Sequence, residues 1–167
     1  MSSRVVVLAD THLLTAPRPR GSLPQSALVH LREADVILHA GDLLDAGVLD
    51  MLREYAPVHA VLGNNDGSLV KLLPPSRLVD LEGVRVGMVH DGGARAGRAT
   101  RLRRRFPDAD VVVFGHSHAP CSEVGDNGQL LFNPGSPTQR RAQPVRTLGV
   151  LCLGDAAVLR ASIIPLY

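Results

Sequence analysis

Five short, largely apolar runs rich in valine constrain the fold of this chain more than any other feature. Each run is ended by Gly, Asp, Asn or His, and the runs cover residues 5–9, 36–39, 58–62, 84–89 and 111–114. Runs that do not alternate between apolar and polar residues are typical of strands that are covered on both faces. We therefore expect five buried strands with further layers packed against them.

Segments with helical periodicity separate these runs. Apolar residues recur at the spacing of one helix face in residues 25–33, 47–55, 67–73 and 95–106. Strands that alternate with helices predict an α/β domain.

After Gly115 the pattern changes to one of antiparallel hairpins. Turn signals at Asp126–Gly128 and Gly154–Asp155 separate short apolar segments, and Glu82–Gly83 marks an earlier hairpin of the same kind. We expect two facing sheets, partly parallel and partly antiparallel, with helices on the outside.

Composition predicts one domain spanning residues 1–167, because 45% hydrophobic content fills a core of that size. The net charge of +2 gives no reason to expect a nucleic-acid partner. Cys121 and Cys152 have no paired spacing, and the first apolar run is too short for a signal peptide or a membrane span. These features predict a cytoplasmic protein without membrane attachment.

Candidate metal ligands follow the apolar runs. Asp10 and His12 come after the first run, and residues two apart in an extended segment face the same side. Asp42, Asn64 and His90 follow the next runs. Taken alone, several of these have structural explanations, because Asp42 would cap a helix and Asn64 would belong to a turn. The loop of residues 13–24, rich in proline, would overhang them.

A Gly-His-x-His motif is harder to explain structurally. His116 and His118 lie two residues apart at the end of a buried strand, directly after Gly115. Both imidazoles need partners there, and a metal ion satisfies both. This motif favours metal ligation over a purely structural role.

In this order, the Asp-x-His, Gly-Asp, Gly-Asn, strand-end His and Gly-His-x-His motifs resemble those of the calcineurin-like metallophosphoesterases. The resemblance runs from Val5 to about Ser136. Because no capping domain is expected, the chain is similar to the small single-domain phosphodiesterase branch of that family. This resemblance implies an α/β fold that is a two-sheet mixed β-sandwich flanked by helices, in four αββα layers.

The resemblance also implies two divalent metal ions. The implied ligands are Asp10, His12 and His118 for one ion, Asn64, His90 and His116 for the other, and Asp42 as a bridge between them. Carboxylate, amide and imidazole ligands without thiolates suit manganese, iron, zinc or nickel, and we expect manganese.

The resemblance implies a metal-dependent phosphoric ester hydrolase, most simply a phosphodiesterase that acts on small phosphate esters. A hydroxide that bridges the ions would attack phosphorus in line, with catalysis depending on Asp42, Asn64, His90 and His116. Two alternatives stay open: a non-catalytic interaction module on the same fold, and a nuclease. The five arginines of residues 98–105 have no interleaved aromatic residues for base stacking, so nucleic acid is disfavoured. The sequence does not indicate an oligomeric state.

Asn65 is the clearest departure from the family pattern, which has His or Cys at that position. Asn cannot donate a proton to a leaving group at neutral pH. His90 is followed by Asp91 where the family more often has Gly. Other residues are expected beside the ligands or the substrate: His39, Asp66 and Asp91 around the ligands, Asn133–Ser136 as the floor, and Arg140 and Arg141 at the substrate phosphate.

Overall fold

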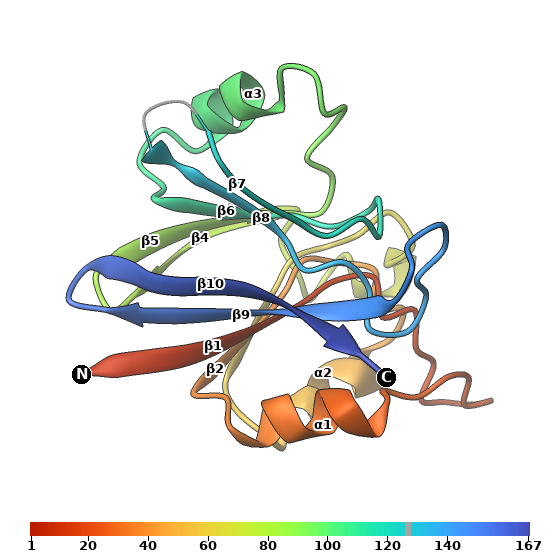
Figure 1. Cartoon of the computed structure of the whole chain (residues 1–167). Helices are drawn as coiled ribbons and strands as arrows, with labels where there is room; N and C mark the ends of the chain where they lie inside the picture. Colours follow the sequence, from red (N-terminus) through yellow and green to blue (C-terminus); the bar gives the residue numbers. More distant parts are fainter. Residues whose placement is uncertain (126–127) are drawn as a thin grey trace.

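The computed structural model describes residues 1–125 and 128–167 (Figure 1). In chain order its elements are β1 (Ser2–Leu8), α1 (Gln25–Arg32), β2 (Val36–His39), α2 (Ala46–Arg53), β3 (Val58–Ala60), the 3₁₀ turn η1 (Gly67–Leu69), β4 (Ser76–Leu81), β5 (Val84–Val89), α3 (Arg98–Arg105), β6 (Val111–Val113), β7 (Cys121–Val124), β8 (Leu130–Asn133), β9 (Arg146–Gly154) and β10 (Ala157–Leu166).

The strands form two mixed sheets of five strands each. One sheet has the order β10-β9-β1-β2-β3, and the other has the order β4-β5-β6-β8-β7. In the first sheet β1, β2 and β3 run parallel, while β9 and β10 are antiparallel. In the second sheet β5, β6 and β8 run parallel, and β4 and β7 pair antiparallel at its edges. The predicted mixture of parallel and antiparallel strands is confirmed.

The two sheets pack face to face, with α1 and α2 on one outer face and α3 on the other (Figure 1). Side chains alternate along β1, so that Val5 and Val7 lie in the core between the sheets while Val6 and Leu8 pack in the core beneath α1 and α2. A third, smaller core lies around Phe114 on the face that α3 covers. The four-layer αββα sandwich is confirmed, and it explains the unbroken apolar runs.

One predicted helix is wrong. Residues 67–73 form only the 3₁₀ turn η1 followed by further turns, not an α-helix. Leu69 and Leu73 are buried, but Val70 and Leu72 are exposed, so there is no apolar face wide enough to hold a helix. Pro74 then prevents any continuation, because the residue before a proline avoids the helical region.

The predicted hairpins are present at two positions. Turns join β4 to β5 at Glu82–Gly83 and β9 to β10 at Asp155–Ala156. The turn predicted at Asp126–Gly128 includes residues 126 and 127, which lie outside the described residues. No helix among those described is long and apolar enough to cross a bilayer.

The parallel strands determine where the candidate ligands lie. Strands β1, β2, β3, β5 and β6 all end at the same edge of the sandwich, and backbone bonds tie the segments after them together. Asp10 N–H donates to the Gly41 carbonyl at 2.9 Å, and Gly115 N–H donates to the His90 carbonyl at 2.8 Å. Residues that are distant in the chain therefore meet at one edge.

Candidate metal centre

All seven predicted ligands lie at this edge of the sandwich. They arrive from both sheets: Asp10 and His12 after β1, Asp42 after β2, Asn64 after β3, His90 after β5, and His116 and His118 after β6. Most are sheltered from solvent, whereas Asn64 and His116 are exposed at the mouth of the cluster. The cluster is therefore open to solvent on one side.

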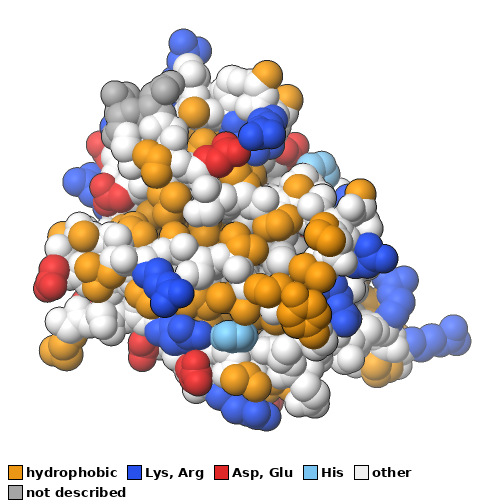
Figure 2. All heavy atoms as spheres, viewed as in Figure 1, with side chains coloured by type: hydrophobic (Ala, Val, Ile, Leu, Met, Phe, Trp, Pro, Cys, Tyr) orange, Lys and Arg blue, Asp and Glu red, His pale blue; other side chains and the backbone are white. Residues whose placement is uncertain are grey.

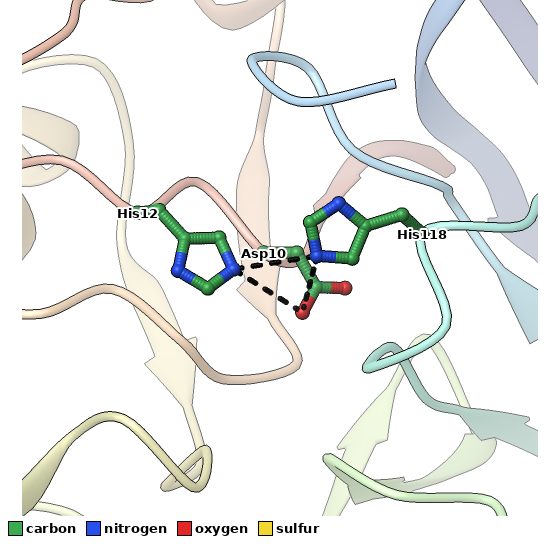
Figure 3. A group of neighbouring side chains, drawn as sticks. All are labelled: Asp10, His12 and His118. Atoms are coloured by element: carbon green, nitrogen blue, oxygen red, sulfur yellow. Dashed lines mark hydrogen bonds and ion pairs between the residues drawn. The ribbon is translucent and has the colours of Figure 1, made fainter. Parts of the chain in front are cut away.

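Asp10, His12 and His118 form the first group of ligands, and their polar atoms point toward one another (Figure 3). The Asp10 Oδ1 atom lies 3.9 Å from His12 Nε2 and 3.6 Å from His118 Nε2. The two Nε2 atoms are 3.3 Å apart. All three ligand atoms lie within 4.8 Å of one another, which suits a single cation between them.

Asn64, His90 and His116 form the second group. The Asn64 Oδ1 atom lies 3.0 Å from His90 Nε2 and 3.1 Å from His116 Nδ1. The three side chains thus surround one point from three different loops. Both predicted triads are brought together by the structure.

Asp42 lies between the two groups. Its Oδ2 atom is 3.5 Å from His12 Nε2 in the first group and 3.5 Å from His90 Nε2 in the second. Asp10 Oδ1 also lies 3.8 Å from His90 Nε2, so this carboxylate borders the second group as well. Asp42 therefore borders both ligand groups.

Backbone carbonyls fix the orientation of two of the imidazoles. His90 Nδ1 lies 2.7 Å from the Ala40 carbonyl, and His118 Nδ1 lies 2.6 Å from the Gln139 carbonyl. A carbonyl can only accept, so each Nδ1 carries the proton and donates it. In the neutral ring this leaves the Nε2 lone pair of both residues facing the centre, as metal ligation requires.

The donor set fits a cation. Asp10 Oδ1 is buried and has no hydrogen-bond partner among the described residues, and a buried carboxylate oxygen left in that state is costly. Around it, acceptor atoms face one another, as Asn64 Oδ1 faces the lone pair of His90. Positive charge between these atoms removes both penalties, and oxygen and nitrogen ligands without sulfur suit a divalent first-row metal.

Strained backbone accompanies the ligands. Five of the seven have positive φ: 54° at Asp10, 47° at His12, 61° at Asp42, 70° at His116 and 57° at His118. Residues other than glycine rarely adopt this conformation, and such strain concentrates at functional sites. The strain is held by the surrounding hydrogen bonds and aims alternate side chains at the centre.

Gly41 shows why the loop before Asp42 needs a glycine. Its φ is 95°, and an added Cβ would lie 2.7 Å from both Gly63 N and His90 Nδ1. Any side chain would therefore push apart the two loops that carry Asp42 and His90.

The two carboxylates titrate very differently in the metal-free protein. Burial raises the pKa of Asp10 to about 7, assisted by the neighbouring charge of Asp42 and opposed by that of His90. Burial also acts to raise the pKa of Asp42, but hydrogen bonds with His90 and Asn65 outweigh it and hold that pKa well below its usual range. Asp42 therefore stays ionised, whereas Asp10 is partly protonated near neutral pH.

The histidines also differ. Burial lowers the pKa of His12 and of His118, so both rings are neutral ligands at neutral pH. Burial acts to lower the pKa of His90 too, but the hydrogen bonds to Asp42 and to the Ala40 carbonyl outweigh it, and the pKa is raised. Protons thus compete with metal chiefly at Asp10 and His90.

We expect manganese to bind the metal-free protein about tenfold more weakly at pH 6 than at pH 8. A carboxylate with a pKa of about 7 is mostly protonated at pH 6, and one unit of pKa corresponds to one decade of affinity. Calorimetry in two buffers of different ionisation enthalpy measures both the affinity and the proton released on binding. Equal affinity at the two pH values, with no proton release at pH 6, would contradict the assignment of Asp10 as a ligand.

Asn65 and Asp66 hold Asp42 and its loop in place. Asn65 donates from its backbone N–H to Asp42 Oδ1 at 2.9 Å and from Nδ2 to Asp42 Oδ2 at 2.8 Å. Asp66 accepts from the backbone N–H groups of Asp42, Gly63 and Leu44 at 2.7–2.9 Å. Asp66 therefore orients backbone, not an imidazole, and its side chain does not cap η1. Likewise Asp42 caps no helix, because Asp45 caps α2.

His39 is buried beneath the centre. Its Nδ1 accepts from Gly41 N–H at 3.2 Å, and its Nε2 lies 3.0 Å from Thr11 Oγ1. Burial lowers the pKa of His39 to about 3, so the ring is neutral and donates from Nε2 to Thr11. His39 thus supports the loops that carry Asp10 and Asp42 without facing the ligands.

Asn133–Ser136 packs under the ligand loops. Asn133 donates from Nδ2 to the Gly115 carbonyl at 3.1 Å, and Ser136 donates from Oγ to the Asp10 carbonyl at 2.8 Å. Both side chains are buried. The segment connects the loop of Asp10 with that of His116, so its contacts are those of a floor and not of a free turn.

Of the other residues expected near the substrate or the ligands, Asp91 and Arg140 bond to nearby backbone, whereas Arg141 lies close to the centre. Asp91 is exposed, and its carboxylate accepts from Gly93 N–H at 2.7 Å, so it supports a local turn. Arg140 donates to the Gln143 carbonyl at 2.8 Å. Arg141 is close enough to the centre that its charge acts to lower the pKa of Asp10 and of both histidines of the first group.

Sequence reasoning missed the partners that orient the ligands. The Ala40 and Gln139 carbonyls leave no signal in a sequence, because every residue has a carbonyl. Thr138 donates from Oγ1 to the Thr11 carbonyl at 2.7 Å, and no motif in the sequence predicted this hydrogen bond. Only the Asn-Pro-Gly-Ser turn that precedes Thr138 offered a cue.

Comparison with known proteins agrees with this geometry. The calcineurin-like phosphoesterase superfamily domain matches residues 4–156. A probable metallophosphoesterase from Methanothermobacter thermautotrophicus is 38% identical over 138 residues, which are 81% of this chain and 77% of that protein. Another from Methanocaldococcus jannaschii is 33% identical over 168 residues, covering 96% of this chain and 80% of that protein.

A solved structure has the same fold. Vps29 from Entamoeba histolytica, crystallised in complex with Zn²⁺, superposes with a TM-score of 0.72 at 24% identity, covering 97% of this chain and 98% of that one. The fold, the match over nearly the whole sequence and the identity to two probable metallophosphoesterases lead to one conclusion. This chain belongs to the calcineurin-like phosphoesterase superfamily.

Proposed function

We propose that this protein is a phosphodiesterase with two divalent metal ions, manganese by preference, and that it acts in the cytoplasm as a single domain on small phosphate esters. The observation that carries the proposal is the position of Asp42. One of its oxygens lies 3.5 Å from an imidazole nitrogen of each ligand group. Such an atom can serve two ions at once.

The ligand assignment follows the two groups. Asp10, His12 and His118 would hold one ion; Asn64, His90 and His116 would hold the other; Asp42 would belong to both. Two bound divalent cations supply a hydroxide nucleophile at neutral pH and neutralise charge on the phosphoryl oxygens during in-line attack. Two ligand carboxylates do not cancel four positive charges, so the loaded site favours an anionic substrate.

The protein's own residues prepare this site. Asn65 and Asp66 hold Asp42, and the Ala40 and Gln139 carbonyls hold His90 and His118 in the ligating orientation. Arg141 lies within electrostatic reach of the first group, and a guanidinium there would neutralise a phosphoryl oxygen. Arg140 is engaged with the Gln143 carbonyl, so we assign the phosphate contact to Arg141.

The proposal is tested by elemental analysis of the purified protein together with hydrolysis of bis(4-nitrophenyl) phosphate. We expect two metal ions per chain and turnover with manganese. Parallel assays with iron, zinc and nickel rank the metals, and the zinc complex of the Entamoeba histolytica Vps29 structure makes zinc the competitor to include. A protein that holds metal but hydrolyses no phosphate ester would favour the interaction module.

Asn65 predicts a steep dependence of rate on the leaving group. Its amide is bound to Asp42 and carries no acidic proton, so nothing at this position protonates a departing alkoxide. We expect nitrophenyl diesters to react much faster than alkyl diesters, and Asn65→His to reduce the difference. The measurement is kcat against leaving-group pKa across a series of substituted phenyl diesters. A flat plot for the unmodified protein would contradict this role.

A further inference from the structure

A polar hollow opens beside the first ligand group. It has a volume of about 490 Å³ and is lined by the loop after β1, the segment between β8 and β9, and the first residue of β9. His12 forms part of its wall, and Gln139, whose carbonyl orients His118, forms another part. The hollow therefore borders the candidate metal centre, and its volume is that of a pocket for a small molecule and not just for one phosphate.

The lining of this hollow is polar and positively charged. Arg20 and Arg146 are among its lining residues, Leu13 is the one hydrophobic residue among them, and none of them is acidic. In the part of the chain that the structure describes, neither guanidinium has an ion pair or a side-chain hydrogen bond. Arg95, by contrast, lines a different hollow and pairs with Glu123 at 3.2 Å. The hollow beside His12 thus has two uncompensated positive charges.

Backbone hydrogen bonds bring Arg20 back beside the start of the loop. Leu14 and Arg20 exchange two backbone hydrogen bonds, at 3.1 and 2.8 Å, which close the loop between them. Thr15 bonds the side chain of Asp45 through its N–H and its Oγ1, both at 2.7 Å, which ties the loop to the start of α2. Arg146 lies opposite on β9, paired in register with Leu166. One arginine comes from a tethered loop and the other from a strand.

Figure 2 shows Lys and Arg side chains gathered on the side of the molecule toward which the loop after β1 projects in Figure 1. Two arginines that line one hollow bring two positive charges to it, and phosphate and carboxylate match the hydrogen-bonding geometry of a guanidinium group.

We propose that Arg20 and Arg146 form a second anion subsite, which selects phosphate esters whose organic half carries a further phosphate or carboxylate group. This inference rests on the proposed function, because it places the reacting phosphate at the metal centre beside His12. The organic half of the ester then lies in the hollow, where Ser22 and Gln139 can form hydrogen bonds with it.

The test compares two diesters that differ only in the second anion. Thymidine 5′-(4-nitrophenyl phosphate) has none, and the same compound with a 3′-phosphate has one, while the leaving group and the reacting phosphorus are identical. With the manganese-loaded protein we expect kcat/KM to be about tenfold or more higher for the 3′-phosphorylated compound, as charge-assisted hydrogen bonds predict. The difference should lie mainly in KM.

The variants Arg20→Gln and Arg146→Gln should each reduce this preference, measured as the ratio of the two kcat/KM values, severalfold. Arg18→Gln is the matched control, because Arg18 is exposed in the same loop but does not line the hollow. Calorimetric binding of thymidine 3′,5′-bisphosphate and thymidine 5′-phosphate gives a readout that does not depend on turnover, and the bisphosphate should bind more tightly in an arginine-dependent way.

The outcomes separate the two proposals. Equal kcat/KM for the two diesters, with equal binding of the two nucleotides, would overturn the subsite and leave the phosphodiesterase proposal standing. Tighter binding of the bisphosphate that both arginine variants weaken, without turnover of either diester, would support the subsite and count against the proposed activity. A preference that neither variant reduces would place the second anion elsewhere and overturn the assignment.

Discussion

Replacing Asp42 by Asn should reduce hydrolysis of bis(4-nitrophenyl) phosphate by at least about a thousandfold, a factor that corresponds to about 4 kcal/mol of activation free energy. The physical reason is that Asp42 Oδ2 borders both ligand groups, so one substitution would weaken both of the proposed metal sites. Asn has nearly the same shape as Asp, so the fold should persist. The same variant should hold one metal ion or none.

The control for this variant is Asp50→Asn, which makes the same charge change on the exposed face of α2. Its activity and metal content should match those of the unmodified protein. Circular dichroism on both variants verifies that the fold is intact, and elemental analysis counts the ions. An Asp42→Asn protein with full activity and two ions per chain would refute the bridging role and with it the dinuclear assignment.

Complete removal of metal by chelation should abolish turnover, and adding manganese should restore it. Removal should also lower the midpoint of thermal unfolding, because a ligand present at a hundred times its Kd stabilises the native state by about 2.7 kcal/mol. For a domain of this size that amounts to about 5–10 °C. The loss of stability arises at Asp10, because among the described residues its buried Oδ1 atom has no hydrogen-bond partner and Asp42 is a neighbouring negative charge.

The measurements are differential scanning calorimetry and an assay of nitrophenolate release, both on the same metal-free and reloaded samples. Magnesium, which keeps its waters and prefers oxygen ligands, is the control ion and should restore less of both properties. Full activity in a sample shown by elemental analysis to be free of metal would overturn the proposed function. A metal-dependent rise in the unfolding midpoint without activity would instead indicate a structural or interaction role.

Much of the fold could be predicted from residue patterns. The apolar run of residues 5–9 faces two cores in alternation, and only a strand with layers on both sides satisfies that composition. Residues 67–73 show the limit of this reasoning, because helical spacing alone does not provide a surface against which Val70 and Leu72 can pack. Periodicity predicts which face of an element is apolar, and tertiary packing decides whether the element forms.

The candidate ligands were identifiable for a related reason. Parallel strands of one sheet end at one edge, so Asp10, Asp42 and Asn64 were expected to approach one another after β1, β2 and β3, whereas His90 follows a strand of the other sheet and depends on how the two sheets pack. The side chains that do not follow a strand were harder to place. Asp91 had the same expected role as Asp66, yet it bonds Gly93 at an exposed turn while Asp66 is buried against the Asp42 loop.

The amino-acid sequence by itself determined the chemistry of the centre, because the types of ligand and their positions after buried strands are properties of the chain. Only the tertiary structure decided how those ligands are aimed. The Ala40 and Gln139 carbonyls that orient His90 and His118, and the loop closure that brings Arg20 beside His12, arise from contacts between segments distant in sequence. Backbone groups are identical in every residue, so their roles depend on where folding places them.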